Sequence, residues 1–436
     1  MKKRLLNILF WSVLSAAFIG PGTVTTAAKA GAVYQYQLLW ALVFSTFACI
    51  VLQEAAARLT LVSGLNLGEA IRRRYRDTGW FVWVVVLVVG AIILGSAAYE
   101  TGNILGALAG IRFIVSGPSW LWVLLIALFA AVMLSLRSVR VVAHVLGFLV
   151  AVMGVAFFVT ALAVKPDPAE VLKGAFIPGI PAGGGAGLLI LGLIGTTVVP
   201  YNLFLGSGMA GERQTLKEMR SDLSVAVFLG GLISMAVLVA GTSVRGDFSY
   251  EGLVAALRAG TGRWAVVIFG TGMLAAGFTS AVTAPLASAI TARSLFYEEK
   301  RQGWGEGKRW FTLTWLGVLL TGVAFGLSGV KPVPVIILAQ ALNGLILPLI
   351  TVFLFRVVND PALMGEHRNS RGANLLMFLV NWVTLTLGLW QLTGVSMRAA
   401  GVEIKNQKIL LIAIVIVALG VDVVVGGRYL KDKRQK

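Results

Sequence analysis

Cysteine is almost absent from this sequence, and charged side chains are scarce. The single cysteine, Cys49, excludes a disulfide within the chain and a metal site built on cysteines. Only 13% of the 436 residues are charged, whereas 58% are hydrophobic, and the mean hydropathy is +0.87. A soluble protein of this size needs a more polar surface, so the composition is typical of a polytopic helical membrane protein. The sequence also has no nucleotide-binding GxxxxGKS/T motif and no recognisable catalytic triad, which argues against an enzyme.

Long apolar runs take up most of the chain. Stretches of ~20 apolar residues, the length that crosses a bilayer, recur about twelve times. They centre on 7–33, 38–62, 80–107, 118–136, 141–164, 186–211, 222–243, 264–292, 310–328, 332–357, 372–393 and 408–426. The connections between them are short, so we expect one integral membrane domain over residues 1–436, without a soluble appendage.

Acidic residues are outnumbered by basic ones, 19 against 37, which gives a net charge of +18 at pH 7. If the N-terminus is cytoplasmic, most Lys and Arg residues fall on cytoplasmic segments, and this bias predicts that both termini are cytoplasmic. We expect a bacterial-type cytoplasmic (inner) membrane, contact with anionic lipid headgroups, and a monomer. The basic residues are dispersed over many loops, which argues against nucleic acid as a partner.

Two of the apolar stretches are interrupted by proline. The first contains FIGPGTVTTAAKAGA (18–32), and the sixth contains LIGTTVVPYNLFLGSG (193–208). They stand five spans apart, at equivalent places in two halves at about 5–165 and 185–358, which two extra helices follow at about 370–428. Paired interruptions in corresponding helices are typical of the substrate site of a transporter. The alternative is a pair of ordinary proline kinks.

Four further stretches carry motifs: AGAVYQYQLLWALV (30–43), LTLVSGLNLGEAIRRRY (59–75), AAGFTSAVTAPLASAITARSL (275–295) and LAQALNGLILPL (338–349). In this order they resemble the first-to-second-span connection, the end of the second span with its loop, the eighth span and the tenth span of the Nramp family of divalent-metal transporters. The resemblance implies an all-α, LeuT-like fold of two inverted five-helix repeats, with broken helices 1 and 6 and about twelve transmembrane helices. It also implies secondary active transport by alternating access.

The residues at both breaks depart from the family pattern. Nramp metal transporters carry Asp-Pro-Gly-Asn at the first break, where this chain has Gly20 and Thr23 in place of the Asp and the Asn. At the second break, Val199 and Tyr201 replace the family's Met and His. A bare divalent ion needs anionic or strongly donating ligands to replace its water shell. We therefore expect no site for a dehydrated transition metal.

Removal of the carboxylate favours an anion at the breaks, because half-helices beginning near Gly22 and Tyr201 offer free N–H groups and positive dipole ends. The predicted substrate site consists of Gly20, Gly22, Thr23, Thr196, Thr197, Tyr201, Asn202 and Gln340. The leading prediction is a transporter of a small anion, with bicarbonate ahead of formate, nitrate or a small amino acid. The alternative is a divalent cation, hydrated Mg²⁺ or Mn²⁺, with H⁺ as an optional coupling ion. A non-transporting scaffold or receptor is a third class.

Coupling needs other residues, because the acidic pair of the family's third span falls on Ser96 and Tyr99 here. In LeuT-like folds, hydroxyls of the eighth span and carbonyls of the first form a Na⁺ site. The predicted Na⁺ site consists of Gly20, Thr279, Ser280 and Thr283. The alternative role of these hydroxyls is close helix packing. Apart from Na⁺ as coupling ion, we expect no cofactor.

The remaining polar residues within spans are candidates for coupling or gating. Glu100 is an intramembrane acid that could handle protons or pair with Lys29. Glu54 and Arg58 lie four residues apart in the second span, so we expect them to pair on one helix face in a structural or gating role. Asp422, in the last span, lies outside the ten-helix core, where we expect a structural or oligomer contact.

Overall fold

A computed structural model describes residues 19–135, 140–181, 185–209, 214–296, 304, 308–399 and 407–432. Within these residues the chain is helical and contains no strand. The long helices are α3 (Leu39–Ser63), α5 (Phe81–Arg112), α6 (Ser119–Ser135), α7 (Arg140–Ala163), α11 (Leu216–Gly241), α13 (Ala265–Phe296), α14 (Arg309–Leu327), α15 (Pro332–Val358), α17 (Arg371–Ala399) and α18 (Gln407–Asp432). The half-helices at the two breaks are α2 (Pro21–Tyr34), α9 (Ala186–Thr197) and α10 (Pro200–Met209).

These helices confirm the all-α, polytopic fold expected from the sequence. In the described residues, eight helical stretches are long and apolar enough to cross a membrane, and three shorter apolar helices accompany them. Each predicted span coincides with one helix, or, for the sixth span, with the pair α9 and α10; residues 7–18 of the first span lie outside the described residues. The residue bounds of the two repeats stay a prediction.

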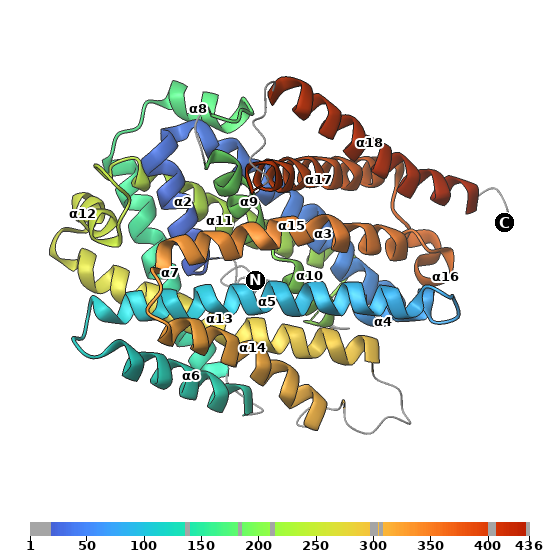
Figure 1. Ribbon diagram of the computed structural model, residues 1–436, viewed down its shortest axis with the longest axis horizontal. Helices are drawn as coiled ribbons and strands as arrows, with labels where there is room; N and C mark the ends of the chain where they lie inside the picture. Colours follow the sequence, from blue (N-terminus) through green and yellow to red (C-terminus); the bar gives the residue numbers. More distant parts are fainter. Residues whose placement is uncertain are drawn as a thin grey trace.

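The short helices lie at the two ends of the bundle. They are η1 (Gln35–Leu38), α4 (Leu67–Tyr75), α8 (Pro168–Phe176), α12 (Tyr250–Thr261), η2 (Gly262–Trp264), α16 (Pro361–Met364) and η3 (Gly365–His367). Figure 1 shows α8 and α12 at one end and α4 and α16 at the opposite end. An ion pair between Arg74 of α4 and Asp360, the residue that caps α16, fastens the latter two together.

Proline stands at the start of some helices and in the interior of others. Pro21 and Pro200 each stand at the first position of a helix, where a missing N–H leaves no hydrogen bond unmade. Pro285 and Pro348, in contrast, lie inside α13 and α15, which continue through them. The interruption predicted at Pro200 is therefore present between α9 and α10, and a helix begins at Pro21 as predicted, although the stretch before residue 19 lies outside the described residues.

Close backbone contact holds α5 against α13, which run side by side through the bundle (Figure 1). A Cβ atom at Gly277 of α13 would lie 2.7 Å from the backbone nitrogen of Ala107 and 2.7 Å from the carbonyl oxygen of Asn103. Such separations are shorter than real Cβ atoms allow, so only glycine permits this approach. Small residues at helix contacts are the usual means of close packing in membranes, where apolar burial gives little drive.

Candidate functional site: two helix breaks and a buried polar centre

The two breaks meet in the middle of the bundle. Gly20 is extended, with φ −90° and ψ 178°, and α2 begins directly after it. At the second break, α9 ends at Thr197 and α10 begins at Pro200. A hydrogen bond of 2.9 Å joins the hydroxyl of Thr23, in the first turn of α2, to the hydroxyl of Thr196 at the end of α9. Side chains that are 173 residues apart in the chain thus bring both breaks together.

Gln340 of α15 covers the first turn of α2. A Cβ atom at Gly22 would overlap with the side-chain amide of Gln340, so the absence of a side chain at Gly22 makes room for that amide. Gln340 is fully buried, and neither its amide oxygen nor its amide nitrogen has a hydrogen-bond partner within the described residues. Its amide can therefore offer both a donor and an acceptor to a substrate.

Two tyrosines and a serine complete the wall around Gly20. The rings of Tyr99 and Tyr201 meet edge to face, with centroids 5.4 Å apart. A Cβ atom at Gly20 would lie 3.2 Å from the hydroxyl oxygen of Ser280 and 3.8 Å from that of Tyr99. The site therefore draws on α2, α5, α9, α10, α13 and α15.

We call this group the polar centre; it consists of Gly20, Gly22, Thr23, Tyr99, Thr196, Tyr201, Ser280 and Gln340. Four of its side chains have buried polar atoms without a hydrogen-bond partner in the described part of the chain: Tyr99, Tyr201, Ser280 and Gln340. Buried polar groups are ordinarily hydrogen-bonded, and those that are not call for an explanation. At membrane depth, a cluster of such atoms is a candidate site for a polar substrate.

Asn202 and Thr197 differ in what their side chains do. Asn202 follows Tyr201 in the first turn of α10, is fully buried, and has no partner for either amide atom within the described residues. The hydroxyl of Thr197 donates instead to the carbonyl of Leu193, one turn earlier in its own helix. Asn202 can thus contribute to the site, whereas the Thr197 hydroxyl hydrogen is already used.

Among the predicted Na⁺ residues, too, one hydroxyl lacks a partner within the described residues and the others donate to their own helix. Ser280 faces Gly20 with an unpartnered hydroxyl. Thr279 and Thr283 are half-buried, and their hydroxyls donate to the carbonyls of Ala276 and Ser280 in their own helix. A hydroxyl that donates to its own helix keeps lone pairs that can bind a cation.

Glu100 is a buried acid beside the polar centre. One carboxylate oxygen accepts a hydrogen bond of 3.1 Å from the side-chain nitrogen of Asn103, and the other has no partner among the described residues. Its side chain packs against Gly322 of α14. Lys29 therefore does not pair with Glu100, and of the two roles considered for this acid the handling of protons remains.

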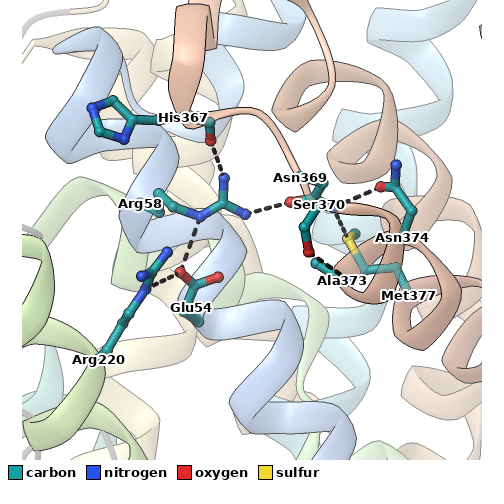
Figure 2. A network of polar contacts seen from close by, with 9 residues as sticks. All are labelled: Glu54, Arg58, Arg220, His367, Asn369, Ser370, Ala373, Asn374 and Met377. Carbon is teal, nitrogen blue, oxygen red and sulfur yellow. Dashed lines mark hydrogen bonds and ion pairs between the residues drawn. The ribbon is translucent and has the colours of Figure 1, made fainter.

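Glu54 and Arg58 pair, as their spacing predicts, and they belong to a larger network (Figure 2). One oxygen of Glu54 accepts hydrogen bonds from Nε of Arg58 at 3.0 Å and from Nε of Arg220 at 2.8 Å. Arg58 also donates to the carbonyl of His367 and to the side-chain oxygen of Asn369. The network joins α3, the start of α11 and the connection from α15 to α17.

Tyr99 is the residue of the polar centre that the sequence did not predict, because the comparison with the family pattern marks its position only as one that lacks the family's acid. The signal was its place in the third span, one residue before an intramembrane acid. In the described residues, no three His, Cys, Asp or Glu side chains gather where they could hold a metal ion together. The expectation of no dehydrated transition-metal site stays a prediction.

Broken half-helices that meet at a buried polar centre define a membrane transporter with a LeuT-like fold. A family model described as natural resistance-associated macrophage protein-like (Nramp) matches residues 12–394. The chain belongs to the Nramp family, and it is therefore a membrane transporter of small ions.

Known proteins agree with this assignment. The chain is 26% identical to the metal transporter Nramp6 of Arabidopsis thaliana over 408 residues, 88% of this chain and 76% of that protein. The crystal structure of a variant of the Eremococcus coleocola manganese transporter matches with a TM-score of 0.72 and 19% identity, over 96% of this chain and 94% of that one. Mhp1, a nucleobase-cation-symport-1 family transporter, matches with a TM-score of 0.54 and 14% identity, over 98% and 93% of the two chains.

The prediction of a small anion, with bicarbonate first, is wrong. The family model and the curated relatives are those of metal transporters, and they favour the alternative, a divalent cation. The physical reason is that hydroxyl and amide groups have no fixed preference of charge. They donate to an anion, but they also accept from the water molecules around a cation or bind the cation directly. The absence of the Asp at position 20 therefore does not by itself set the charge of the substrate.

Proposed function

We propose that the protein is a secondary active transporter of a divalent metal cation, which it carries with part of its water shell. The observation on which the proposal rests is the set of unpartnered polar atoms where the two breaks meet. Membership of the family and the names of the relatives, metal transporters and a manganese transporter, support a metal as the substrate.

The ligands at the polar centre support a hydrated ion. Gly20 offers no carboxylate and Val199 no thioether, so the groups present are hydroxyls and amides. Neutral oxygen ligands suit hard cations such as Mg²⁺ and Mn²⁺, and Mg²⁺ in particular gives up its water reluctantly. A cation that keeps several water molecules needs hydrogen-bond acceptors around it rather than several anionic ligands.

Coupling is a separate proposal. Glu100, buried beside the centre with one unpartnered oxygen, is the candidate for a proton-coupled cycle. Na⁺ coupling through Gly20, Thr279, Ser280 and Thr283 requires the hydroxyl lone pairs described above. Replacement of Na⁺ by choline distinguishes the two, because concentrative uptake stops if Na⁺ drives it and continues under a pH gradient if protons do.

The charge pattern supports a proposal for the location of the protein. We propose a bacterial-type inner membrane, with both termini cytoplasmic and the basic segments against anionic lipid headgroups. We also propose that the transporter is a monomer. Cysteine-accessibility labelling of an added terminal cysteine in sealed inverted vesicles tests the orientation, and the oligomeric mass in detergent tests the monomer.

The experiment that tests the function is uptake of Mg²⁺ and Mn²⁺, measured in parallel, into proteoliposomes that contain the purified chain. Gln340→Leu removes both unpartnered amide atoms at the centre and should reduce uptake at least tenfold. Thr386→Val is the matched control, because it removes a buried hydroxyl that also lacks a partner but lies in α17, away from the breaks. It should leave uptake unchanged.

Two results would contradict the proposal. If the folded parent protein moves neither cation faster than empty liposomes do, the transported substrate is not a divalent metal. If Gln340→Leu and the parent take up metal equally well, the cation does not pass through the polar centre.

A further inference from the structure

A second buried acid lies outside the transport site, between the last two helices. Asp422 of α18 is 3% exposed and Asn381 of α17 is 4% exposed. The side-chain nitrogen of Asn381 donates a hydrogen bond to one oxygen of Asp422. Both residues lie about ten positions from the ends of α17 and α18 that face the α16 side of the bundle, a depth of roughly 15 Å along a helix.

Two oxygen atoms of this pair have no hydrogen-bond partner within the described residues. The second carboxylate oxygen of Asp422 and the amide oxygen of Asn381 are both buried, and neither has a partner within the described residues. Both are acceptors, so neither can satisfy the other while Asp422 is ionised. A species that is positively charged or donates hydrogen bonds has to meet them.

A cavity lies next to these atoms, bounded by α15, α17 and α18. Its wall includes Thr351, Phe355, Phe378, Asn381 and Asp422, and its free volume of about 10 Å³ holds one particle of about the size of a water molecule. Asp422 is the only ionisable residue in the wall. A carboxylate in such surroundings is costly unless a counter-charge neutralises it.

The shape and ligands of the cavity favour a cation over a bare proton, which needs no such space. The hydroxyl of Thr351 donates to the carbonyl of Leu347, so its lone pairs remain free for a cation. One carboxylate balances one positive charge, and oxygen ligands select a hard ion. We propose that Asp422, Asn381 and Thr351 form a binding site for a monovalent cation of the size of Na⁺, distinct from the transport site.

Met377 connects this cavity to the network of polar contacts around Arg58. Met377 also lines the cavity, and its sulfur accepts a hydrogen bond of 3.1 Å from the side-chain nitrogen of Asn369. Asn369 in turn accepts from Arg58 in the network of Figure 2. A bound cation therefore holds α17 and α18 against α15, next to the contacts that connect α3 and α11.

Thermal unfolding of the purified full chain in detergent, with NaCl titrated against choline chloride at constant ionic strength, tests the proposal. The parent protein should gain about 3 °C in Tm when Na⁺ reaches a hundredfold excess over its dissociation constant. Asp422→Asn should lose this response while its Tm without Na⁺ is at least that of the parent, because a neutral amide needs no counter-charge. Thr351→Val should raise the half-maximal Na⁺ concentration about fivefold.

Asp222→Asn is the matched control. Asp222 is also a buried acid with an unpartnered oxygen, but it lies in α11 and does not line the cavity. This variant should keep the full Na⁺ response. The site is refuted if Na⁺ does not change the Tm of the parent, which would leave water in the cavity. It is equally refuted if acidification replaces Na⁺ completely, which would make the ligand a proton, or if Asp422→Asn responds to Na⁺ as the parent does.

Discussion

Gly20→Asp restores a carboxylate at the first break, and the structure has space for it. The φ of −90° at Gly20 is open to any residue. The new Cβ would lie 3.2 Å from the hydroxyl oxygen of Ser280, which has to move by a few tenths of an ångström, and 3.8 Å from that of Tyr99. Because both hydroxyls lack partners in the described residues, both can donate to the added carboxylate.

The magnitude follows from three opposing contributions. Burial of the carboxylate costs several kcal/mol, and two hydrogen bonds to a charged group return about 1.5–3 kcal/mol each. Attraction to the cation is worth ~4 kcal/mol per unit charge at 4 Å and an effective dielectric constant of ~20. Displacement of water from the ion offsets part of this gain. We expect a net of ~1.4–3 kcal/mol, which is a dissociation constant for Mn²⁺ roughly 10- to 100-fold lower.

Isothermal titration of the purified parent, Gly20→Asp and Gly20→Asn with Mn²⁺ measures the effect. The asparagine variant has nearly the same shape without the charge, and it should change the affinity less than threefold. If Gly20→Asp is well folded and binds Mn²⁺ no more tightly than Gly20→Asn does, then position 20 is not in contact with the metal, and the assignment of the polar centre is wrong.

Three further predictions concern coupling, the network around Arg58 and packing. Glu100→Gln should abolish the stimulation of Mn²⁺ uptake by an inward pH gradient while downhill uptake continues, and unchanged stimulation would exclude Glu100 as the proton carrier. Arg58→Ala removes a side chain that is 4% exposed and that donates to Glu54, His367 and Asn369, so it should destabilise the fold by ~2 kcal/mol. Arg220→Ala, at a side chain 55% exposed, should cost under ~1 kcal/mol; thermal unfolding compares the two variants, and equal losses would contradict the ranking. Gly106→Ala places a methyl group onto the ring of Pro21 and should displace the start of α2 from α5, which should reduce uptake. Normal uptake by this variant would refute that contact.

The fold could be predicted from the sequence, and so could the two places where a helix begins at an internal proline. Long apolar stretches predict the helices, since hydropathy alone sets the length that crosses a bilayer, and the prolines at 21 and 200 mark both breaks. A proline does not by itself predict a break, because Pro285 and Pro348 lie inside continuous helices. The order of the motifs that resemble the Nramp family indicates which prolines stand at breaks.

Contacts between distant residues could not be predicted in the same way. The hydrogen bond between Thr23 and Thr196, and the position of Tyr99 against Tyr201, depend on how four helices pack. The substrate was mistaken for a further reason: a missing carboxylate says what a site lacks, whereas hydroxyls and amides serve ions of either sign. Charge deduced from absent residues alone therefore pointed to the wrong class of ion.

The backbone contact between α5 and α13 separates folding from substrate choice. Gly277 rests on α5, and the three atoms nearest to a Cβ placed there belong to Ala107 and Asn103, not to positions 20, 23, 199 or 201. Mutations at those four positions therefore leave this backbone contact in place, so the transported ion can change while α5 and α13 stay packed. A scaffold of this kind can change its substrate without changing its fold. A library randomised at these positions should yield mostly well-expressed proteins that differ in the ion they carry.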